Sequence, residues 1–338
     1  MHSLILETPG HFVRTNAETP PPPGPGEARV RVHRVGVCGT DLHAYRGKQP
    51  FFTYPRRLGH ELGVEVVALG SPTDRLRVGD RCAVEPYLHC GYCQACRRGK
   101  PNCCENLRVL GVHTDGGLCE WLNVPIDKLH PSDRLTYEQL ALVETLAIGA
   151  HTVERATPRA DDTVLVVGAG PIGLAVLVSL RGLGVRVAVT DREASRLAFV
   201  RVHYPDVKTL LADGTLPDQL PSLFTGALPT IVVDATGNPA SMMAAFHYVA
   251  PGGTLVYVGL FQGDVTFADP LFHRKELTLL ASRNALPQTF RSLISQLERG
   301  DIDTTPWITH RADLADVPAQ FPGWLDPVTG VVKAMITV

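Results

Sequence analysis

A glycine pattern in the middle of this 338-residue chain restricts its possible folds more than any other feature. Gly168, Gly170 and Gly173, with Pro171 and Ile172 among them, follow the apolar run TVLVV and open the run PIGLAVLVSL. This order predicts a buried strand, a tight turn and a helix. The first glycine permits the turn, the second lets the backbone approach a pyrophosphate, and the third allows close packing of helix and strand. The N–H groups at the helix start would face the phosphates of a dinucleotide.

Alternating strand and helix patterns continue this motif through residues 146–285. The run VRVAVTD predicts a second strand, and TIVVDATG and TLVYVGL predict further buried strands, with helical patterns between them. Such alternation predicts a parallel sheet with helical crossovers. Asp191 follows Gly168 by 23 residues, where an acid binds a ribose 2′-hydroxyl. A carboxylate there would repel a 2′-phosphate, which favours NAD over NADP, although the adjacent Arg192 weakens that preference.

Residues 1–145 and 286–338 have a different sequence pattern. Short β-type runs such as EARVRVHRVGV and ELGVEVVALG, punctuated by Gly and Pro, predict a β-rich, barrel-like unit. The last stretch contains a helical pattern, TFRSLISQLERG, and ends in a strand pattern, GVVKAMITV. If that strand rejoins the first unit, the nucleotide-binding domain of residues 146–285 is inserted into one domain formed by residues 1–145 and 286–338.

Half of the eight cysteines lie close together: Cys90, Cys93, Cys96 and Cys104 have the spacing C-x2-C-x2-C-x7-C. Four thiolates can surround one Zn²⁺ tetrahedrally and leave no open position, which predicts a structural zinc site. An iron–sulfur centre is the alternative. Disulfides are disfavoured because the start, MHSLILETPG, lacks the basic and apolar regions of a signal peptide. Cys104 is assigned rather than its neighbour Cys103 because its spacing fits better.

Composition excludes several classes of function. The formal net charge of −2 provides no basic field that would recruit nucleic acid or anionic lipid. Hydrophobic residues make up 44% of the chain, yet no apolar run reaches the roughly eighteen residues of a membrane span. We therefore expect a cytoplasmic, two-domain globular protein with a small-molecule substrate and no nucleic-acid or membrane partner.

A second set of possible metal ligands lies outside the cysteine segment. Cys38 occurs in VGVCGTDLH, and His60 and Glu61 occur in LGHELG. A thiolate and an imidazole are good zinc ligands, and a catalytic zinc keeps one position open. Glu144 lies among apolar residues in ALVETLAIGA, where a buried carboxylate would need a partner such as a metal. The residues alone leave Glu144 equally open to being a helix-surface acid, and His60 to being a core histidine.

The motifs CGTDLH, GHE, the four-cysteine segment, GAGPIG and VDATG occur in an order that resembles the medium-chain zinc-dependent alcohol and polyol dehydrogenases over the whole chain. The resemblance implies an α/β protein with a GroES-like β-rich catalytic domain and a Rossmann doubly wound parallel-sheet nucleotide domain. It implies that Cys38 and His60 bind a catalytic zinc, and that Glu61 lies beside the metal and ligates it transiently. Alcohol dehydrogenases of this family have a further cysteine where this chain has Glu144, the polyol-type variant. Glu144 would bind zinc directly or hold a zinc-bound water.

Further segments, including GKQPFFTYPRRLGHE, NCCEN, GVHTDGG, VGLFQG and ASRNA, resemble the bacterial sugar-acid branch of the family. This implies an enzyme with two zinc ions per chain that transfers hydride to NAD. Its substrate would be a polyol or a sugar acid such as L-galactonate or L-gulonate, oxidised at C5. A cyclitol or amino-cyclitol dehydrogenase remains an alternative. A catalytically silent zinc-binding regulatory relative would be expected to lack Cys38 or His60. Relatives form dimers or tetramers, so we expect a homodimer or homotetramer.

The resemblance also implies roles for individual residues. Thr40 would hydrogen-bond the reacting oxygen, and His43 would relay its proton towards solvent. An arginine fork suits a substrate carboxylate, which makes Tyr54, Arg56, Arg57 and Arg283 candidate substrate contacts. The remaining candidate cofactor contacts are Arg196, Asp234, Ala235, Thr236, Val258, Gly259, Leu260 and Asn284.

Overall fold

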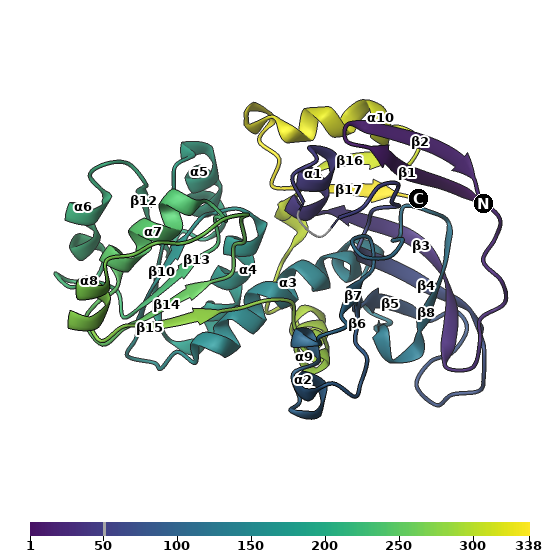
Figure 1. The fold of residues 1–338 in the computed structure, drawn as a ribbon, viewed down its shortest axis with the longest axis horizontal. Helices are drawn as coiled ribbons and strands as arrows, with labels where there is room; N and C mark the ends of the chain where they lie inside the picture. Colours follow the sequence, from purple (N-terminus) through teal and green to yellow (C-terminus); the bar gives the residue numbers. More distant parts are fainter. Residues whose placement is uncertain (50–51) are drawn as a thin grey trace. The chain divides into compact units, whose positions relative to one another are not determined.

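The computed structural model describes residues 1–49 and 52–338, which form two compact units (Figure 1). One unit consists of Met1–Thr145 and Leu286–Val338, and the other of Leu146–Ala285. Pro50 and Phe51, in the segment GKQPFFTYPRRLGHE, lie outside the described residues. The chain passes from one unit to the other within helix α3 (Tyr137–Ala156).

The unit Leu146–Ala285 contains a six-stranded parallel sheet in the order β12–β11–β10–β13–β14–β15 (Figure 1). This order confirms the predicted doubly wound fold, and its switch point lies between β10 and β13, where ligands bind in such sheets. The strands are β10 (Thr163–Val167), β11 (Arg186–Asp191), β12 (Lys208–Leu211), β13 (Ile231–Asp234), β14 (Thr254–Tyr257) and β15 (Thr278–Ala281).

Helices connect the parallel strands of this unit, as right-handed crossovers require. Leu165, Val232 and Leu255 on three neighbouring strands are fully buried and pack with Phe224 and Phe246 in one core. The central strands β10 and β13 are buried along their whole length because both faces of a parallel sheet are covered. The helices are α4 (Pro171–Leu180), α5 (Ala194–His203), α6 (Leu216–Leu223), α7 (Pro239–Tyr248) and α8 (Asp269–Arg274).

The other unit is built on a seven-stranded sheet in the order β16–β17–β3–β4–β5–β9, with β8 also paired to β3. Strand β17 pairs antiparallel with β3, so the end of the chain lies beside its first long strand. The strands are β3 (Glu27–Val37), β4 (Glu61–Leu69), β5 (Arg81–Val84), β8 (Trp121–Pro125), β9 (Leu129–Pro131), β16 (Ile308–Asp313) and β17 (Lys333–Thr337).

Two two-stranded antiparallel sheets and, among the described residues, four α-helices besides the first part of α3 complete this unit. The sheets pair β1 (His2–Thr8) with β2 (His11–Asn16), and β6 (Tyr87–Leu88) with β7 (Arg108–Val109). The helices are α1 (Gly39–Tyr45), α2 (Gln94–Arg97), α9 (Pro287–Glu298) and α10 (Val317–Gln320). In the part of the chain that the structure describes, no helix has the length and apolar character needed to cross a membrane.

Candidate functional site

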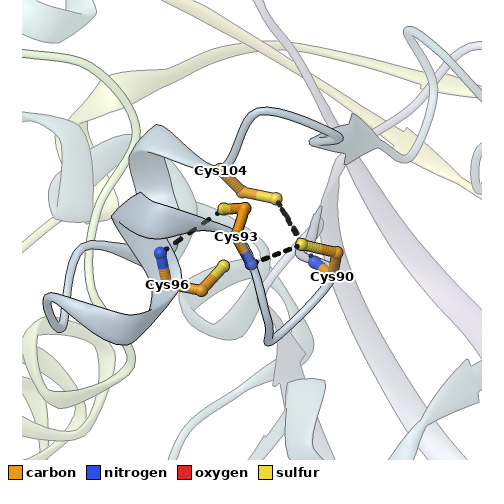
Figure 2. A group of neighbouring side chains, drawn as sticks. All are labelled: Cys90, Cys93, Cys96 and Cys104. Carbon is orange, nitrogen blue, oxygen red and sulfur yellow. Dashed lines mark hydrogen bonds between the residues drawn. The ribbon is translucent and has the colours of Figure 1, made fainter.

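Cys90, Cys93, Cys96 and Cys104 form a compact cluster of thiols, with their sulfur atoms turned towards one another (Figure 2). The segment of residues 90–104 that carries them is called the lobe below. The Sγ atoms all lie within 4.8 Å of each other, and those of Cys90 and Cys104 are 3.5 Å apart. A tetrahedron with 2.3 Å arms has edges of about 3.8 Å, so the cluster fits one zinc ion. The neighbouring Cys103 is exposed and is not part of the cluster.

Backbone N–H groups of the lobe point at its sulfur atoms. The N–H of Cys90 donates to Cys104 Sγ at 3.3 Å, and that of Cys93 donates to Cys90 Sγ at 3.4 Å. Burial raises the pKa of the Cys90 thiol, but the N–H groups of Tyr92 and Cys93 outweigh it and lower this pKa to about 6. Cys90 therefore favours the thiolate form, which is the form that binds a metal, whereas burial raises the pKa of Cys96 to about 12.

A second cluster consists of Cys38, His60 and Glu61, whose ligand atoms also lie within 4.8 Å of one another. Cys38 follows strand β3 and precedes α1, while His60 immediately precedes β4. Strands β3 and β4 are antiparallel, with Gly36 opposite Glu61, and this register brings the motifs CGTD and GHE together.

Asp41, in the first turn of α1, lies beside both Cys38 and His60 of this cluster. Its Oδ2 accepts a hydrogen bond from the Cys38 N–H at 2.9 Å, and its Oδ1 lies 3.7 Å from His60 Nδ1. Among the described residues, neither Oδ1 nor Nδ1 has a hydrogen-bond partner, although both atoms are buried. Metal-binding histidines usually direct their second ring nitrogen at a carboxylate. With Nδ1 on the Asp41 side, Nε2 is the nitrogen available to a metal.

Negative charge accumulates around His60. Burial lowers the pKa of His60, but the charges of Asp41, Cys38 and Glu144, together with a hydrogen bond to Cys38, raise it well above its ordinary value. Burial also raises the pKa of Asp41 and Glu144, so this buried acidic group favours an extra positive charge, which a divalent cation would supply. The donor set, a thiolate, an imidazole and carboxylates, fits zinc.

Glu61 makes a buried ion pair with Lys333 of β17. The Nζ atom of Lys333 lies 2.6 Å from Oε1 and 2.8 Å from Oε2, and also donates to Thr145 Oγ1 at 3.2 Å. A Cβ atom on Gly36 would lie 2.1 Å from Glu61 Oε2, so the glycine makes room for the carboxylate. Burial raises the pKa of Glu61, whereas Lys333 acts in the opposite direction and holds it below its ordinary value.

Glu144 lies on α3 and is only 5% exposed, so its interpretation as a helix-surface acid is wrong. Its Oε1 accepts a hydrogen bond of 2.5 Å from the hydroxyl of Tyr87 on β6. Glu144 is not part of the tight group formed by Cys38, His60 and Glu61, although its charge acts on His60. A position close to these three residues but outside their group suits a carboxylate that would reach a metal through water.

Thr40 and His43 both lie on α1, directly after Cys38. Thr40 is half-buried, and His43 is on the exposed side of the helix. Partial burial, and then the positive charges of Arg46 and Lys48, lower the pKa of His43. His43 is therefore neutral, and able to accept a proton, at a lower pH than an ordinary histidine.

The three predicted substrate contacts before His60 all have partners within the protein. The Tyr54 hydroxyl donates to the carbonyl of Ala44 on α1. Arg56 and Arg57 lie 3.6 Å and 3.7 Å from the carboxylate of Asp115. Asp115 reduces the positive charge that either arginine could offer to a substrate carboxylate.

The glycine loop between β10 and α4 has the geometry that its sequence predicts. Gly168 has φ +101°, a backbone conformation that residues other than glycine rarely adopt. A Cβ on Gly173 would lie 1.8 Å from the Gly168 carbonyl oxygen, so the start of the helix packs tightly on the loop. A Cβ on Gly170 would contact only Arg196 Nη1, at 3.6 Å. The loop therefore keeps space for a phosphate beside Gly170.

Asp191 ends β11 and contacts the same loop. Its Oδ2 accepts from the Ala169 N–H at 2.7 Å and lies 3.6 Å from Arg196 Nη1, while its Oδ1 accepts from the Glu193 N–H at 2.8 Å. Arg192 is exposed beside it. Asp191, Arg192 and Arg196 thus lie where the sequence predicts that the ribose of the cofactor would bind.

The other predicted cofactor contacts gather at the carboxyl ends of β13, β14 and β15. The carbonyl of Asp234 accepts from the N–H groups of Val258 and Gly259, each at 3.1 Å. Ala235 and Thr236 follow Asp234 beside the glycine loop, where Thr236 Cγ2 would lie 3.2 Å from a Cβ on Gly168. Leu260 is 66% exposed, and Arg283 and Asn284 follow β15.

A cavity of about 580 Å³ lies elsewhere in the β-rich unit, lined by β1, β2, the turn after β16 and the chain end. None of the predicted site residues lines it. A cavity volume alone does not identify a ligand or a reaction, so no function is assigned to this cavity.

Two family models match separate parts of the chain: the alcohol dehydrogenase GroES-like domain over residues 24–134 and the zinc-binding dehydrogenase over residues 171–299. L-galactonate-5-dehydrogenase of Escherichia coli K12 is 41% identical over 342 residues, covering 100% of this chain and 99% of the relative. The chain belongs to the zinc-type medium-chain dehydrogenases. The family resemblance stated from the motifs is confirmed.

Solved structures agree with this membership. The alcohol dehydrogenase rspB of Escherichia coli CFT073, complexed with NADH, has a TM-score of 0.93 and 33% identity, and the match covers 100% of this chain and 99% of that one. A zinc-binding dehydrogenase of Sinorhizobium meliloti 1021 bound to NADP has a TM-score of 0.89 and 28% identity, with 100% and 99% coverage. This zinc-type dehydrogenase is thus an oxidoreductase that uses zinc and a nicotinamide cofactor.

Sequence reasoning missed three residues that contact the candidate metal ligands or Glu144. Asp41 lies within the quoted motif CGTD, where a carboxylate three residues after a metal cysteine is a usable signal. Tyr87 and Lys333 carry no local motif, because each meets its partner only in the folded chain.

Proposed function

We propose that this dehydrogenase oxidises a secondary hydroxyl of a sugar acid or polyol with NAD, at a zinc ion bound by Cys38 and His60. The observation that carries the proposal is the compact group of Cys38, His60 and Glu61, with a buried carboxylate, Glu144, close to it. Simple alcohol dehydrogenases of the family have a cysteine in place of Glu144, so its presence supports a polyhydroxylated substrate.

The proposed substrate is a sugar acid such as L-galactonate or L-gulonate, oxidised at C5. The 41% identity to L-galactonate-5-dehydrogenase along the full chain supports this class. Tyr54, Arg56 and Arg283 remain the proposed substrate contacts. For Arg56, a buried Nε atom without a partner among the described residues supports the assignment, while the nearby Asp115 weakens it.

Zinc, when bound, acts as a Lewis acid that lowers the pKa of the substrate hydroxyl. The chain's own residues would position the substrate and move its proton. Thr40 would accept the proton of the reacting hydroxyl in a hydrogen bond, and His43 would take that proton towards solvent. The lowered pKa of His43 supports this role because the neutral imidazole is the form that accepts a proton. Glu144 would act through a water molecule.

NAD is the proposed cofactor. Asp191 supports this choice because its buried carboxylate lies beside the glycine loop, where it would repel a 2′-phosphate. Arg192 and Arg196 make NADP the alternative. The ratio of kcat/KM for NAD and NADP measures this preference, and Asp191→Ser should shift the ratio towards NADP.

A screen of NAD reduction across aldonates, polyols, cyclitols and simple alcohols tests the substrate class. We expect aldonates or polyols to be oxidised fastest. Turnover confined to cyclitols would favour the cyclitol alternative, and turnover confined to simple alcohols would contradict the role of Glu144. Cys38→Ser should abolish turnover and lower the zinc content from two ions to one. A Cys38→Ser protein that stays active would refute the proposed metal centre.

A further inference from the structure

The contact between Tyr87 and Glu144 is buried on both sides. Tyr87 is 2% exposed and Glu144 5% exposed, and their oxygens are 2.5 Å apart. The Tyr87 hydroxyl is the donor and Oε1 of Glu144 the acceptor. The bond occupies Oε1 of Glu144 and leaves Oε2 for another partner.

Tyr87 is held from the N-terminal side by a buried charged cluster. Two residues before it, Glu85 Oε1 lies 2.5 Å from Lys128 Nζ and Glu85 Oε2 lies 3.1 Å from His130 Nε2. The side chains of these three residues are only 2–3% exposed. Moving the backbone at Glu85 would break paired buried charges, which is costly.

Tyr87 is also held from the C-terminal side and by its ring. It pairs with Val109 in the β6–β7 sheet, and its ring packs edge-on against Phe290 at 6.1 Å. Three residues further along the chain, Cys90 enters the four-cysteine lobe. The position of the tyrosine is therefore set by surroundings other than Glu144.

We propose that Tyr87 is a positioning residue of the metal centre: its hydroxyl holds Glu144 by Oε1 and presents Oε2 to the metal or to its water. The inference rests on the proposed role of Glu144. A carboxylate on a flexible glutamate side chain can rotate and exchange its oxygens, and a short hydrogen bond from a fixed donor removes this freedom. A tyrosine that only fills the core would instead affect folding and leave the metal unaffected.

The test compares Tyr87→Phe with the unchanged, zinc-loaded enzyme, and repeats the comparison in a Glu144→Ala background. The readouts are the rate at which a chelator removes the catalytic metal, the visible spectrum after Co²⁺ substitution, and kcat and KM separately.

Loss of a hydrogen bond that orients a metal ligand should speed metal release by roughly tenfold or more. In the Glu144→Ala background, Tyr87→Phe should produce no further change. Tyr137→Phe, which removes a tyrosine hydroxyl that donates to Glu65 rather than to Glu144, is the matched control.

The outcomes separate this inference from the proposed function. If Glu144→Ala itself leaves metal release and kinetics unchanged, the proposed role of Glu144 fails and the inference fails with it. If Glu144→Ala impairs the enzyme but Tyr87→Phe does not, only the inference is overturned. It is equally overturned if Tyr87→Phe has the same effect in both backgrounds, or if it changes only the urea unfolding midpoint.

Discussion

Lys333 Nζ lies 2.6 Å from Glu61 Oε1 and 2.8 Å from Oε2, joining two residues that are 272 positions apart. Both side chains are buried, at 1% and 0% exposure. They belong to β17 and β4, which lie on either side of β3, and Gly36 of β3 provides the space between them. The last strand of the chain thus supplies the counter-charge of a carboxylate beside the proposed zinc ligands.

Replacing Lys333 with Met should lower the free energy of unfolding by about 3–5 kcal/mol, because it leaves the buried Glu61 carboxylate without its partner. Urea denaturation measures this loss. Arg311→Met is the matched control, since Arg311 of the neighbouring strand β16 is 54% exposed and forms an ion pair with Glu138 of α3. Such a pair contributes about 0–1 kcal/mol. Equal losses in the two variants would contradict the importance of the Lys333–Glu61 pair.

Asp41→Asn should weaken metal binding at the Cys38–His60 centre by about 10–100-fold, because the carboxylate that orients His60 loses its charge. Chelator competition on the zinc-loaded protein measures the change. Asp127→Asn, at a 55% exposed acid, should leave the affinity unchanged. Unaltered affinity in Asp41→Asn would show that the 3.7 Å approach to His60 has no effect on metal binding.

Cys104→Ser should remove the lobe metal and lower the unfolding midpoint, whereas Cys103→Ser should change neither. The two cysteines are adjacent, but only Cys104 belongs to the thiol cluster, and Cys103 is exposed. Binding of a structural zinc contributes to the free energy of folding, so its loss should destabilise the folded protein. Zinc content and thermal unfolding of the two variants provide the measurement, and zinc loss in Cys103→Ser would reverse the ligand assignment.

The lowered pKa of His43 predicts two effects of pH. If the neutral form relays the substrate proton, the acid limb of kcat/KM should lie below pH 6.5, the ordinary value for histidine, and His43→Asn should abolish that limb. The unfolded chain binds this proton more readily than the folded one. The contribution of His43 to stability is therefore complete above pH 6.5 and is lost as the pH falls towards the folded pKa. Equilibrium unfolding of both proteins across this range measures it, and parallel pH profiles would contradict the prediction.

The parts of the fold that could be predicted are those encoded by short stretches of sequence. The glycine loop requires only Gly168, Gly170 and Gly173 between an apolar strand and a helix, and the lobe requires four cysteines within fifteen residues. In both cases the spacing of these residues along the chain is enough to predict the local geometry. The parallel sheet followed from buried apolar runs that alternate with helical patterns.

The surroundings of the metal centre could not be predicted because they depend on long-range pairing. Tyr87 meets Glu144 only through the packing of β6 on α3, and Lys333 meets Glu61 only through the register of β17 on β3. Glu144 itself was ambiguous, since a carboxylate among apolar residues is compatible with a helix surface until its burial is known. Asp115, which lies between Arg56 and Arg57, carries no sequence signal that links it to them.

The pairing of β17 with β3 also sets an order of events during synthesis. Domains generally fold as units, N-terminal ones first, as the chain leaves the ribosome. Residues 1–145 emerge early but must wait for β17, which is made after the whole of Leu146–Ala285. Until then Glu61 lacks Lys333, and residues 34–37 of β3 have no strand beside them on the edge where β8 pairs with residues 27–31. We therefore expect the nascent β-rich unit to be most vulnerable to aggregation and proteolysis while residues 146–285 are being translated.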